Sequence, residues 1–352
     1  MRTQMKTISK LDDKAGAVLI RRDIPNIADD EILVKNLAVS ICGTDVHIYE
    51  FNDWAKSRIH TPQILGHELA GQVVKIGKLV TSVKVGDIVS AETHIVCGKC
   101  EFCLSGNAHI CQNTCIIGVD RDGAFAEYIA IQARNAWVND PRVDPAYLCV
   151  QEPLGNAIHT VLSGETAGRT LAVVGCGPIG IMAVDVARAV GCAKVFAIDL
   201  NEYRLALALK LGADAAFNPR TCDVVAEILK LTNGMGVDVV CEMSGSAVAF
   251  NQALKYLKKG GRMSILGLPD EPFEIDVAND IVFKGITLNG VTGRRIMTTW
   301  QQGKDLINSG KLHLNEIVTH ILPFEDFEHG FALMHEGNCG KVVLRVGEKE
   351  LV

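Results

Sequence analysis

The stretch "LAVVGCGPIG", residues 171–180, joins a short apolar strand to a glycine-rich turn, and a helical pattern follows it. In a strand–turn–helix unit, the first glycine permits the tight turn, the second lets the backbone approach a pyrophosphate, and the third lets helix and strand pack closely. Gly175, Gly177 and Gly180 have this spacing. Asp199 ends the next expected strand. This context favours a dinucleotide-binding unit over a plain tight turn.

The residues after this turn bear on which dinucleotide binds. A carboxylate at Asp199 would accept hydrogen bonds from the ribose hydroxyls of adenosine and repel a 2′-phosphate, which favours NAD over NADP. Arg204 complicates that preference, but it could equally lie over the adenine or brace Asp199. The sequence therefore predicts NAD.

The chain has two regions with different patterns of apolar residues. From about residue 155, short apolar strands alternate with longer helical runs, as in "KVFAIDL", "NEYRLALALKLG" and "VDVVCEMSG", which predicts a parallel sheet. Residues 30–150 hold β-branched runs separated by Gly, Asp and Pro, such as "EILVKNLAVS", which is typical of antiparallel strands. From about 295 the chain returns to helix and strand, closing with "GKVVLRV". The expected class is α/β with a β-rich domain.

Composition limits the possible partners. With 352 residues, 48% of them hydrophobic and 22% charged, the chain should form about two globular domains. A net charge of -6 with interspersed signs argues against a nucleic-acid partner. The start "MRTQMKTISKLDDKAG" has no signal-peptide core, and no apolar run approaches the roughly 20 residues needed to span a bilayer. We expect a cytoplasmic protein without a membrane partner.

Four cysteines lie in the fifteen residues of "CGKCEFCLSGNAHIC", residues 97–111. A disulfide staple, a redox pair, unrelated free thiols and a metal site are the alternatives. Cytoplasmic thiols stay reduced, and no thioredoxin-like strand and helix surround the first pair. Gaps of two, two and seven suit a closed, structural zinc shell. Its expected ligands are Cys97, Cys100, Cys103 and Cys111.

A second group of candidate ligands is spread along the chain. "SICGTDVHIY", "ILGHELAG" and "QEPLGNAIHT" supply thiol, hydroxyl, imidazole and carboxyl groups. Taken singly these residues suggest ordinary packing, and His67 alone reads as a core or surface histidine. Together with a cofactor motif they indicate a catalytic zinc with an open position. The candidates are Cys42, Thr44, Asp45, His47, His67, Glu68 and Glu152.

"GHE", the cysteine lobe and the "GxGPIG" turn, in this order, resemble the zinc-dependent medium-chain alcohol dehydrogenases. "DWAKSRI", "AETHIVCGKC", "EPLGNAIHT" and "VTGRR" resemble the branch of that family that oxidises L-threonine. The resemblance covers nearly the whole chain. It implies a GroES-like catalytic domain at 1–155 and 293–352, a Rossmann NAD-binding domain at 156–292, an active site in the cleft between them, and a homotetramer.

The resemblance also implies roles for individual residues, with two zinc ions per subunit. Cys42, His67 and Glu68 match the catalytic-zinc positions. Glu152 matches an acidic residue that either exchanges with water as a ligand or acts only in the proton relay, to which Thr44 and His47 correspond. His94 matches a substrate-selecting histidine, although it could only cap the cysteine lobe. The positions that match the NAD lining are Ile179, Asp199, Arg204, Leu266, Gly267, Leu268, Val291 and Thr292.

These roles describe one reaction. Zinc would polarise the C3 hydroxyl of L-threonine, hydride would pass to NAD, and the proton would leave through Thr44 and His47, giving 2-amino-3-oxobutanoate. A polyol or 2,3-butanediol dehydrogenase is the alternative within the family. A zinc- and nucleotide-binding protein without catalysis is the alternative of another class; it predicts damage at Cys42, Thr44 or His67, and the sequence has none.

Overall fold

Residues 3–347 are described by a computed structural model, in which the chain divides into two units. The first unit runs to Glu152 and takes in Val318–Glu336 and the chain from Lys341 onward. The second comprises Pro153–Ile317 and Gly337–Gly340. The terminal residues of the expected β-rich domain, 1–2 and 348–352, lie outside the described residues.

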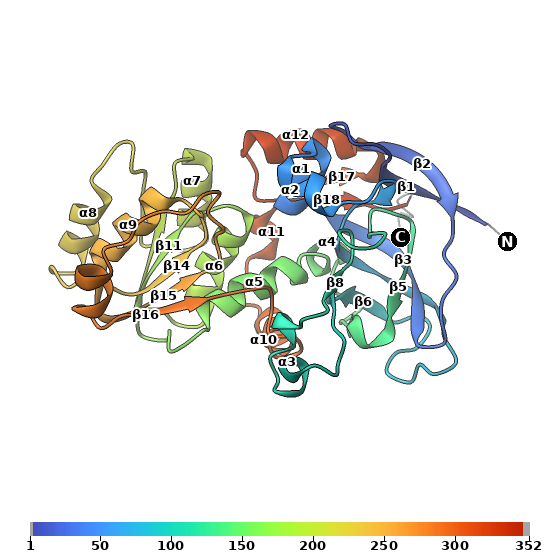
Figure 1. Cartoon of the computed structure of the whole chain (residues 1–352), viewed down its shortest axis with the longest axis horizontal. Coiled ribbons are helices and arrows are strands. Elements are labelled where there is room, and N and C mark those ends of the chain that lie inside the picture. Colours follow the sequence, from blue (N-terminus) through green and yellow to red (C-terminus); the bar gives the residue numbers. More distant parts are fainter. Residues whose placement is uncertain (1–2, 348–352) are drawn as a thin grey trace. The chain divides into compact units, whose positions relative to one another are not determined.

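The second unit is built on a six-stranded parallel sheet in the order β13-β12-β11-β14-β15-β16. Its strands are β11 (Thr170–Val174), β12 (Lys194–Ile198), β13 (Ala215–Phe217), β14 (Val237–Glu242), β15 (Leu257–Ile265) and β16 (Thr287–Gly290). The order reverses between β11 and β14, which is the doubly wound arrangement of dinucleotide-binding domains. The predicted α/β fold class is confirmed, and Figure 1 shows the sheet with its helices.

Helices connect these strands, as the alternation of apolar and helical runs predicts. The connecting elements are α6 (Pro178–Ala189), α7 (Glu202–Lys210), α8 (Val224–Leu231), α9 (Ala247–Tyr256) and the helical turn η3 (Val277–Val282). Helix α5 (Gln151–Val161) precedes the sheet, and α10 (Thr298–Asn308) and α11 (Leu314–Ile317) follow it. One core of this unit packs apolar residues of the strands, such as Val174 and Val240, against Ile228 of α8 and Leu254 of α9. The sheet is therefore covered by apolar helix faces.

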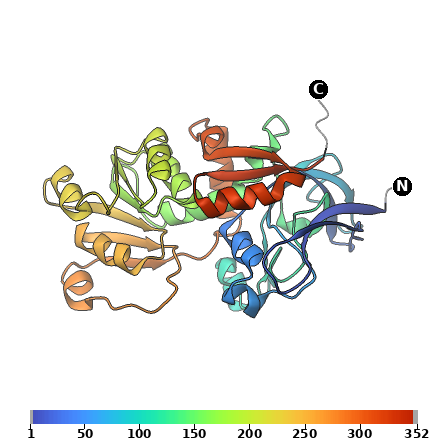
Figure 2. The ribbon, with the colours of Figure 1, turned by 90° about the horizontal axis from the view of Figure 1, so that it is seen from above.

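The first unit consists mainly of antiparallel sheets. Its strands are β1 (Gln4–Lys10), β2 (Val18–Asp23), β3 (Glu31–Ser40), β4 (Gln63–Ile64), β5 (Glu68–Ile76), β6 (Ile88–Ala91), β7 (His94–Ile95), β8 (Cys115–Ile116), β9 (Tyr128–Gln132), β10 (Ala136–Val138), β17 (Val318–Pro323) and β18 (Lys341–Arg345). The long strand β3 pairs antiparallel with β5, β9 and β18. Strand β18, from the chain's end, thus lies beside N-terminal elements of this unit (Figure 2).

Short helices complete the first unit. They are α1 (Gly43–Glu50), α2 (Asp53–Arg58), α3 (Glu101–Leu104), α4 (Pro145–Leu148), α12 (Phe327–Glu336) and the 3-10 turns η1 (Ala108–Ile110), η2 (Ala133–Asn135) and η4 (Phe324–Asp326). Tyr49 of α1 stacks on Phe331 of α12, with ring centroids 4.2 Å apart. This contact anchors α1, which carries three of the candidate site residues. Within residues 3–347, no helix is long and apolar enough to cross a membrane.

The segment 293–317 differs from the expected domain division. It was expected to belong to the β-rich domain, but it lies in the second unit. Buried Asp185 of α6 accepts hydrogen bonds from the backbone N–H (2.7 Å) and Nδ1 (2.8 Å) of His313, and Gly303 of α10 lies against Ile158 of α5. These contacts attach α10 and α11 to helices of the parallel-sheet unit, so the division falls at Val318 instead.

Candidate functional site

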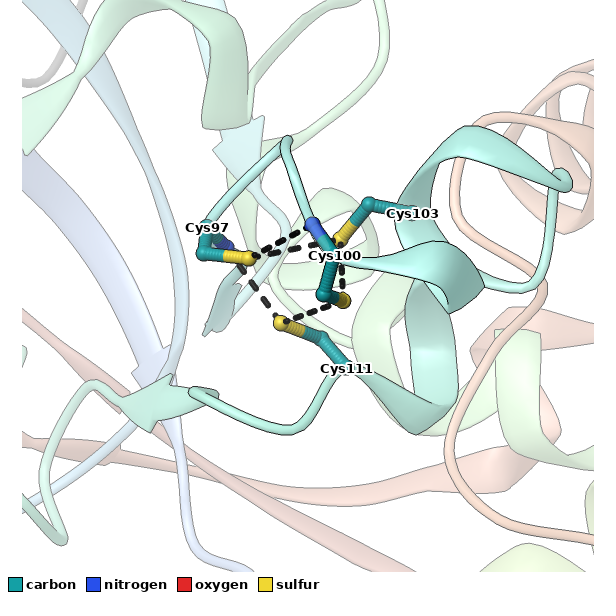
Figure 3. A group of neighbouring side chains, drawn as sticks. All are labelled: Cys97, Cys100, Cys103 and Cys111. Carbon is teal, nitrogen blue, oxygen red and sulfur yellow. Dashed lines mark hydrogen bonds between the residues drawn. The ribbon is translucent and has the colours of Figure 1, made fainter.

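The four cysteines of the lobe at 97–111 converge on one point, as predicted (Figure 3). The Sγ–Sγ distances are 3.6 Å for Cys100–Cys103, 3.8 Å for Cys100–Cys111 and 4.0 Å for Cys97–Cys103. Zinc–sulfur bonds of about 2.3 Å in a tetrahedron place the sulfurs about 3.8 Å apart. The thiols therefore fit a closed zinc shell, and they are free rather than paired as disulfides.

Backbone N–H groups favour the thiolate form, which binds metal, at some of these cysteines. The N–H groups of Lys99 and Cys100 lower the pKa of Cys97 to about 6. Desolvation and the neighbouring thiols instead raise the pKa of Cys103 to about 12. Without a cation the cluster thus keeps a proton on Cys103, and binding a metal would release that proton.

A second cluster joins Cys42, His67 and Glu68, whose ligand atoms lie within 4.8 Å of one another. Cys42 is the N-cap of α1, Glu68 is the first residue of β5, and His67 immediately precedes that strand. The β3–β5 register places Ser40 opposite Glu68, two residues before Cys42. Glu68 is fully buried, and its Oε1 has no hydrogen-bond partner among the described residues. A buried, unpartnered carboxylate oxygen beside a thiol and an imidazole fits a metal ligand set.

Asp45 organises the two loops that carry these ligands. It is fully buried and accepts hydrogen bonds from the backbone N–H groups of Cys42 (3.0 Å) and Gly66 (3.1 Å). Its carboxylate also lies 3.5 Å from His67 Nδ1. Burial opposes a charge on His67, but Asp45 and Cys42 outweigh it and raise the pKa of His67 well above its usual value. The cluster therefore has the negative surroundings of a cation site, with the Asp45 carboxylate facing Nδ1 of the imidazole.

Glu68 is held from behind by a buried lysine. Lys341, the first residue of β18, donates from Nζ to Glu68 Oε2 (2.5 Å) and to the carbonyl oxygen of Ile41 (2.8 Å). Ser40 Oγ donates to the same Oε2. Both side chains of this ion pair are shielded from solvent. One oxygen of Glu68 is thus fixed, and the other is left for a ligand.

The remaining predicted catalytic residues lie on neighbouring elements. Glu152, in the first turn of α5, is buried and accepts a hydrogen bond from Thr93 Oγ1 at 3.0 Å. Burial is the main cause that raises the pKa of Glu68, and the negative charge of Glu152 adds to it. Thr44 and His47 both belong to α1, where Thr44 is half-buried and His47 is exposed.

His94 lies at the start of β7, immediately before the cysteine lobe. Its backbone N–H donates to Glu92 Oε1 at 2.9 Å, and its carbonyl oxygen accepts from Asn135 Nδ2 at 3.1 Å. These bonds hold the backbone at the base of the lobe, which agrees with a structural role. A role in selecting substrate stays a prediction.

The predicted dinucleotide residues lie at the carboxyl edge of the parallel sheet, where ligands of such sheets bind. Gly175 follows β11 with φ +87°, and a Cβ there would lie 2.7 Å from the backbone of Ser244. A Cβ on Gly180 would lie 2.0 Å from the carbonyl oxygen of Gly175, whereas a Cβ on Gly177 would meet nothing within 4 Å. Two glycines are required by packing, and Gly177, at the N-cap of α6, faces open space where a phosphate can approach.

Asp199 and Arg204 follow β12 at the same edge. Asp199 accepts from the backbone N–H groups of Cys176 (2.6 Å) and Asn201 (2.8 Å), which fixes its carboxylate beside the glycine turn. Arg204, in the first turn of α7, has a buried Nε without a hydrogen-bond partner among the described residues. This donor is available to a bound ligand.

The other predicted lining residues follow the ends of β11, β15 and β16. Leu266 and Gly267 donate backbone hydrogen bonds to the carbonyl oxygen of Glu242, and Val291 donates to that of Ile265 at 2.8 Å. Three side chains at this edge are partly or fully exposed: Ile179, Leu268 and Thr292. The topology thus brings the predicted NAD residues to one edge of one sheet.

Comparison with known protein families gives a match in each of the two units. Residues 28–140 match the alcohol dehydrogenase GroES-like domain, and residues 178–309 match the zinc-binding dehydrogenase domain. The chain belongs to the zinc-binding alcohol dehydrogenase family. The fold expected from the resemblance is therefore confirmed, as are the zinc and nicotinamide cofactors that characterise the family.

Individual members of the zinc-binding alcohol dehydrogenase family are similar over nearly the full length. L-threonine 3-dehydrogenase of Caldanaerobacter subterraneus subsp. tengcongensis is 54% identical over 341 residues, covering 97% of this chain and 98% of that protein. An alcohol dehydrogenase of Escherichia coli CFT073, solved with NADH, has a TM-score of 0.89 at 26% identity, over 98% and 100% of the chains. The 2R,3R-butanediol dehydrogenase of Bacillus subtilis has a TM-score of 0.88 at 27% identity, over 97% and 100%.

Sequence reasoning assigned no role to Ser40 or Lys341 and gave Asp45 no separate one. A signal existed for Asp45, because an acid at the third position of a helix can pair with the N-cap backbone. A lysine opening the apolar strand "KVVLRV" was a weaker signal. The pairing of Lys341 with Glu68 depends on β18 joining β3, across about 300 residues of chain, and no local pattern predicts it.

Proposed function

We propose that this dehydrogenase oxidises the C3 hydroxyl of L-threonine to 2-amino-3-oxobutanoate, with NAD as the hydride acceptor. The observation that carries the proposal is the 54% identity to an L-threonine 3-dehydrogenase, against 27% to a butanediol dehydrogenase of the same fold. The preserved cluster of Cys42, His67 and Glu68 supports a catalytic protein over one that only binds zinc and nucleotide.

We assign one zinc ion to Cys42, His67 and Glu68, and a second to the four-cysteine lobe. When bound, the first supplies Lewis-acid polarisation of an alcohol oxygen, and NAD supplies the hydride acceptor. Asp45 orients the imidazole of His67, and Lys341 with Ser40 holds Glu68. Gly177, Asp199 and Arg204 would bind the pyrophosphate and the adenosine ribose.

Oxidation of the alcohol releases one proton besides the hydride, and α1 offers it a route. Thr44 and His47 are three residues apart on a helix, so their side chains share one face. The half-buried hydroxyl of Thr44 can receive a proton and pass it on, and the exposed ring of His47 can release it to water. Glu152, buried near Glu68, is the acid placed to hold a proton or a substrate group beside the metal. His94 would shape the neighbouring substrate pocket.

The substrate assignment is tested by NAD reduction with L-threonine, 2,3-butanediol and sorbitol. A pocket for threonine must pair an ammonium and a carboxylate, whereas a polyol pocket would leave those charges buried and unpaired at several kcal/mol. L-Threonine should therefore have the highest kcat/KM by at least about 100-fold. A higher value for butanediol or sorbitol would replace the threonine assignment by the polyol one.

The same assay with NADP, in the parent and in Asp199→Ala, tests the cofactor site. The carboxylate of Asp199 would accept hydrogen bonds from the ribose hydroxyls of NAD and repel the 2′-phosphate of NADP. The parent should therefore prefer NAD, and the variant should lose much of that preference. Thermal unfolding of the variant controls for loss of the hydrogen bonds to Cys176 and Asn201. An unchanged NAD-to-NADP ratio in a folded variant would remove Asp199 from the cofactor site.

We further propose a cytoplasmic homotetramer. Reducing conditions suit the free thiols of the zinc lobe. Strand β16 ends the parallel sheet without a further partner among the described residues, and Val277, Val282 and Phe283, in the segment that precedes it, are more than half exposed. An open edge with an apolar patch is suited to pair with a second copy.

Light scattering tests this assembly. It should give four times the 38.0 kDa of the chain, and Phe283→Glu should lower that mass. A monomeric parent would exclude the homotetramer.

A further inference from the structure

The turn after α1 brings the side chain of Asn52 against the ring of His47. Phe51 leaves the helix in the left-handed conformation (φ 54°), and the backbone N–H of Asn52 donates to the carbonyl oxygen of His47 at 3.3 Å. Asn52 Nδ2 then lies 3.0 Å from His47 Nδ1. The contact follows from local backbone geometry and leaves the imidazole exposed.

A second hydrogen bond fixes which end of the Asn52 amide faces the ring. Asn52 is the N-cap of α2, and its Oδ1 accepts from the backbone N–H of Ala55 at 3.0 Å. A backbone N–H can only donate, so the amide oxygen must lie at the helix and the NH2 group must face His47. Because the NH2 group of Asn52 donates to His47 Nδ1, that ring nitrogen must carry a lone pair and no proton. The neutral ring that fits this arrangement carries its proton on Nε2.

We propose that Asn52 is a positioning residue that holds His47 in the Nε2–H tautomer. The inference rests on the proposed relay role of His47. In this tautomer Nδ1 has the only ring lone pair, so an arriving proton must be accepted there, in competition with the amide. Once Nδ1 carries the proton, the ring no longer accepts from the NH2 group of Asn52, and Nε2 is the nitrogen that gives its proton to water. Exchange with water then adds a proton at Nε2 and removes the one at Nδ1, which returns the exposed ring to the tautomer that accepts from Asn52.

The test reads the ring nitrogens of His47 by 15N NMR in the zinc-loaded, full-length protein with labelled histidine. The His47 signals are assigned by their loss in His47→Gln. In the parent, Nε2 should give the signal of a protonated ring nitrogen, and Nδ1 that of an unprotonated one. A protonated Nδ1 with an unprotonated Nε2 in the neutral ring would overturn the inference.

Asn52→Asp is the matched variant, because aspartate caps a helix as well as asparagine but presents an acceptor where the amide presents a donor. The two ring signals should exchange, with Nδ1 now protonated. Asn52→Ser also retains a cap but is too short to reach the ring, so its signals should become an average of both tautomers. Parent-like thermal unfolding shows that α2 is intact. Signals that stay as in the parent in both variants would overturn the role of Asn52.

Turnover of L-threonine in the same variants separates this inference from the proposed function. If the ring signals exchange in Asn52→Asp and turnover falls, both the tautomer control and the relay are supported. If the signals exchange and turnover equals that of the parent, Asn52 controls the tautomer but His47 does not carry the proton. If the signals do not exchange, the inference fails whatever the turnover.

Discussion

Lys341→Met is expected to destabilise the protein by about 3–5 kcal/mol, because it leaves Glu68 buried and without its counter-charge. Lys341 and Glu68 are both shielded from solvent, and Lys341 Nζ lies 2.5 Å from Glu68 Oε2. Methionine approximates the length of lysine but offers no donor to Glu68 or to Ile41. Denaturant unfolding followed by zinc analysis should show the lower stability together with loss of the zinc held by Cys42, His67 and Glu68. Turnover should fall with that zinc.

Two control variants separate lost charge from lost packing. Lys341→Arg keeps a cation and should retain more stability and zinc than Lys341→Met. Adding Glu68→Gln to Lys341→Met removes both charges, and it should recover much of the stability without restoring activity. If Lys341→Met unfolds at the same denaturant concentration as the parent and keeps its zinc, the ion pair does not hold Glu68. In that case the double variant should also show no recovery of stability, because Lys341→Met caused no loss.

The pair also explains why Glu68 can be buried at all. Burying a carboxylate without a partner would cost much folding free energy. Ser40 and Lys341 provide hydrogen bonds to Oε2 of Glu68 only. Its Oε1 is left unpartnered among the described residues, which costs stability unless a cation or a ligand occupies the place. The first unit is therefore built to be most stable when the site at Cys42, His67 and Glu68 is filled. This links the stability of the sheet around β3 and β5 to the chemistry of the site.

Local sequence patterns predicted most elements because each pattern has a local cause. Gly175 requires a positive φ and the position of Gly180 leaves no room for a Cβ, whereas Gly177 faces open space; the spacing of all three located the turn. The cysteine gaps likewise predicted a convergence that the sulfur distances fit. Asp199 followed from its position at the end of a strand. The cysteine convergence and the contact of Asp199 with Cys176 involve residues close in sequence, although the space around Gly175 is limited by Ser244, beyond the end of a later strand.

The features that sequence reasoning missed depend on distant contacts. Segment 293–317 contains helical patterns whose partner is not encoded locally, and its attachment depends on Asp185 meeting His313 across 128 residues. Lys341 reached Glu68 only because β18 pairs with β3. Asn52 is the opposite case: its contact with His47 spans five residues, but it required the left-handed conformation of Phe51. Side-chain pattern does not reveal such a turn when the residue is not glycine.

Cys100→Ser is expected to remove the structural zinc and with it much of the order of the lobe at 97–111. Three thiolates remain, and serine is a poor zinc ligand because its hydroxyl stays protonated near neutral pH. The lobe has only the short helix α3 and the turn η1, and within α3 no residue is buried. Structural zinc can supply about 10–16 kcal/mol to the folding of a small domain, so no apolar packing within the lobe could replace it. Zinc content should fall by one ion per chain, and the thermal midpoint should fall with it.

Cys115→Ser is the matched control for that variant. Cys115 is four residues beyond Cys111 and half-buried, but it is not part of the four-thiol cluster. Its substitution should leave the zinc content and the thermal midpoint close to those of the parent. Cys100→Ser should also expose the lobe to proteolysis between residues 97 and 111, which Cys115→Ser should not. A Cys100→Ser protein that keeps both zinc ions and the parent's thermal midpoint, yet loses turnover, would mean that the lobe takes part in the chemistry. The fit of four sulfurs to a closed tetrahedron predicts the reverse, because a closed shell has no position left for a substrate.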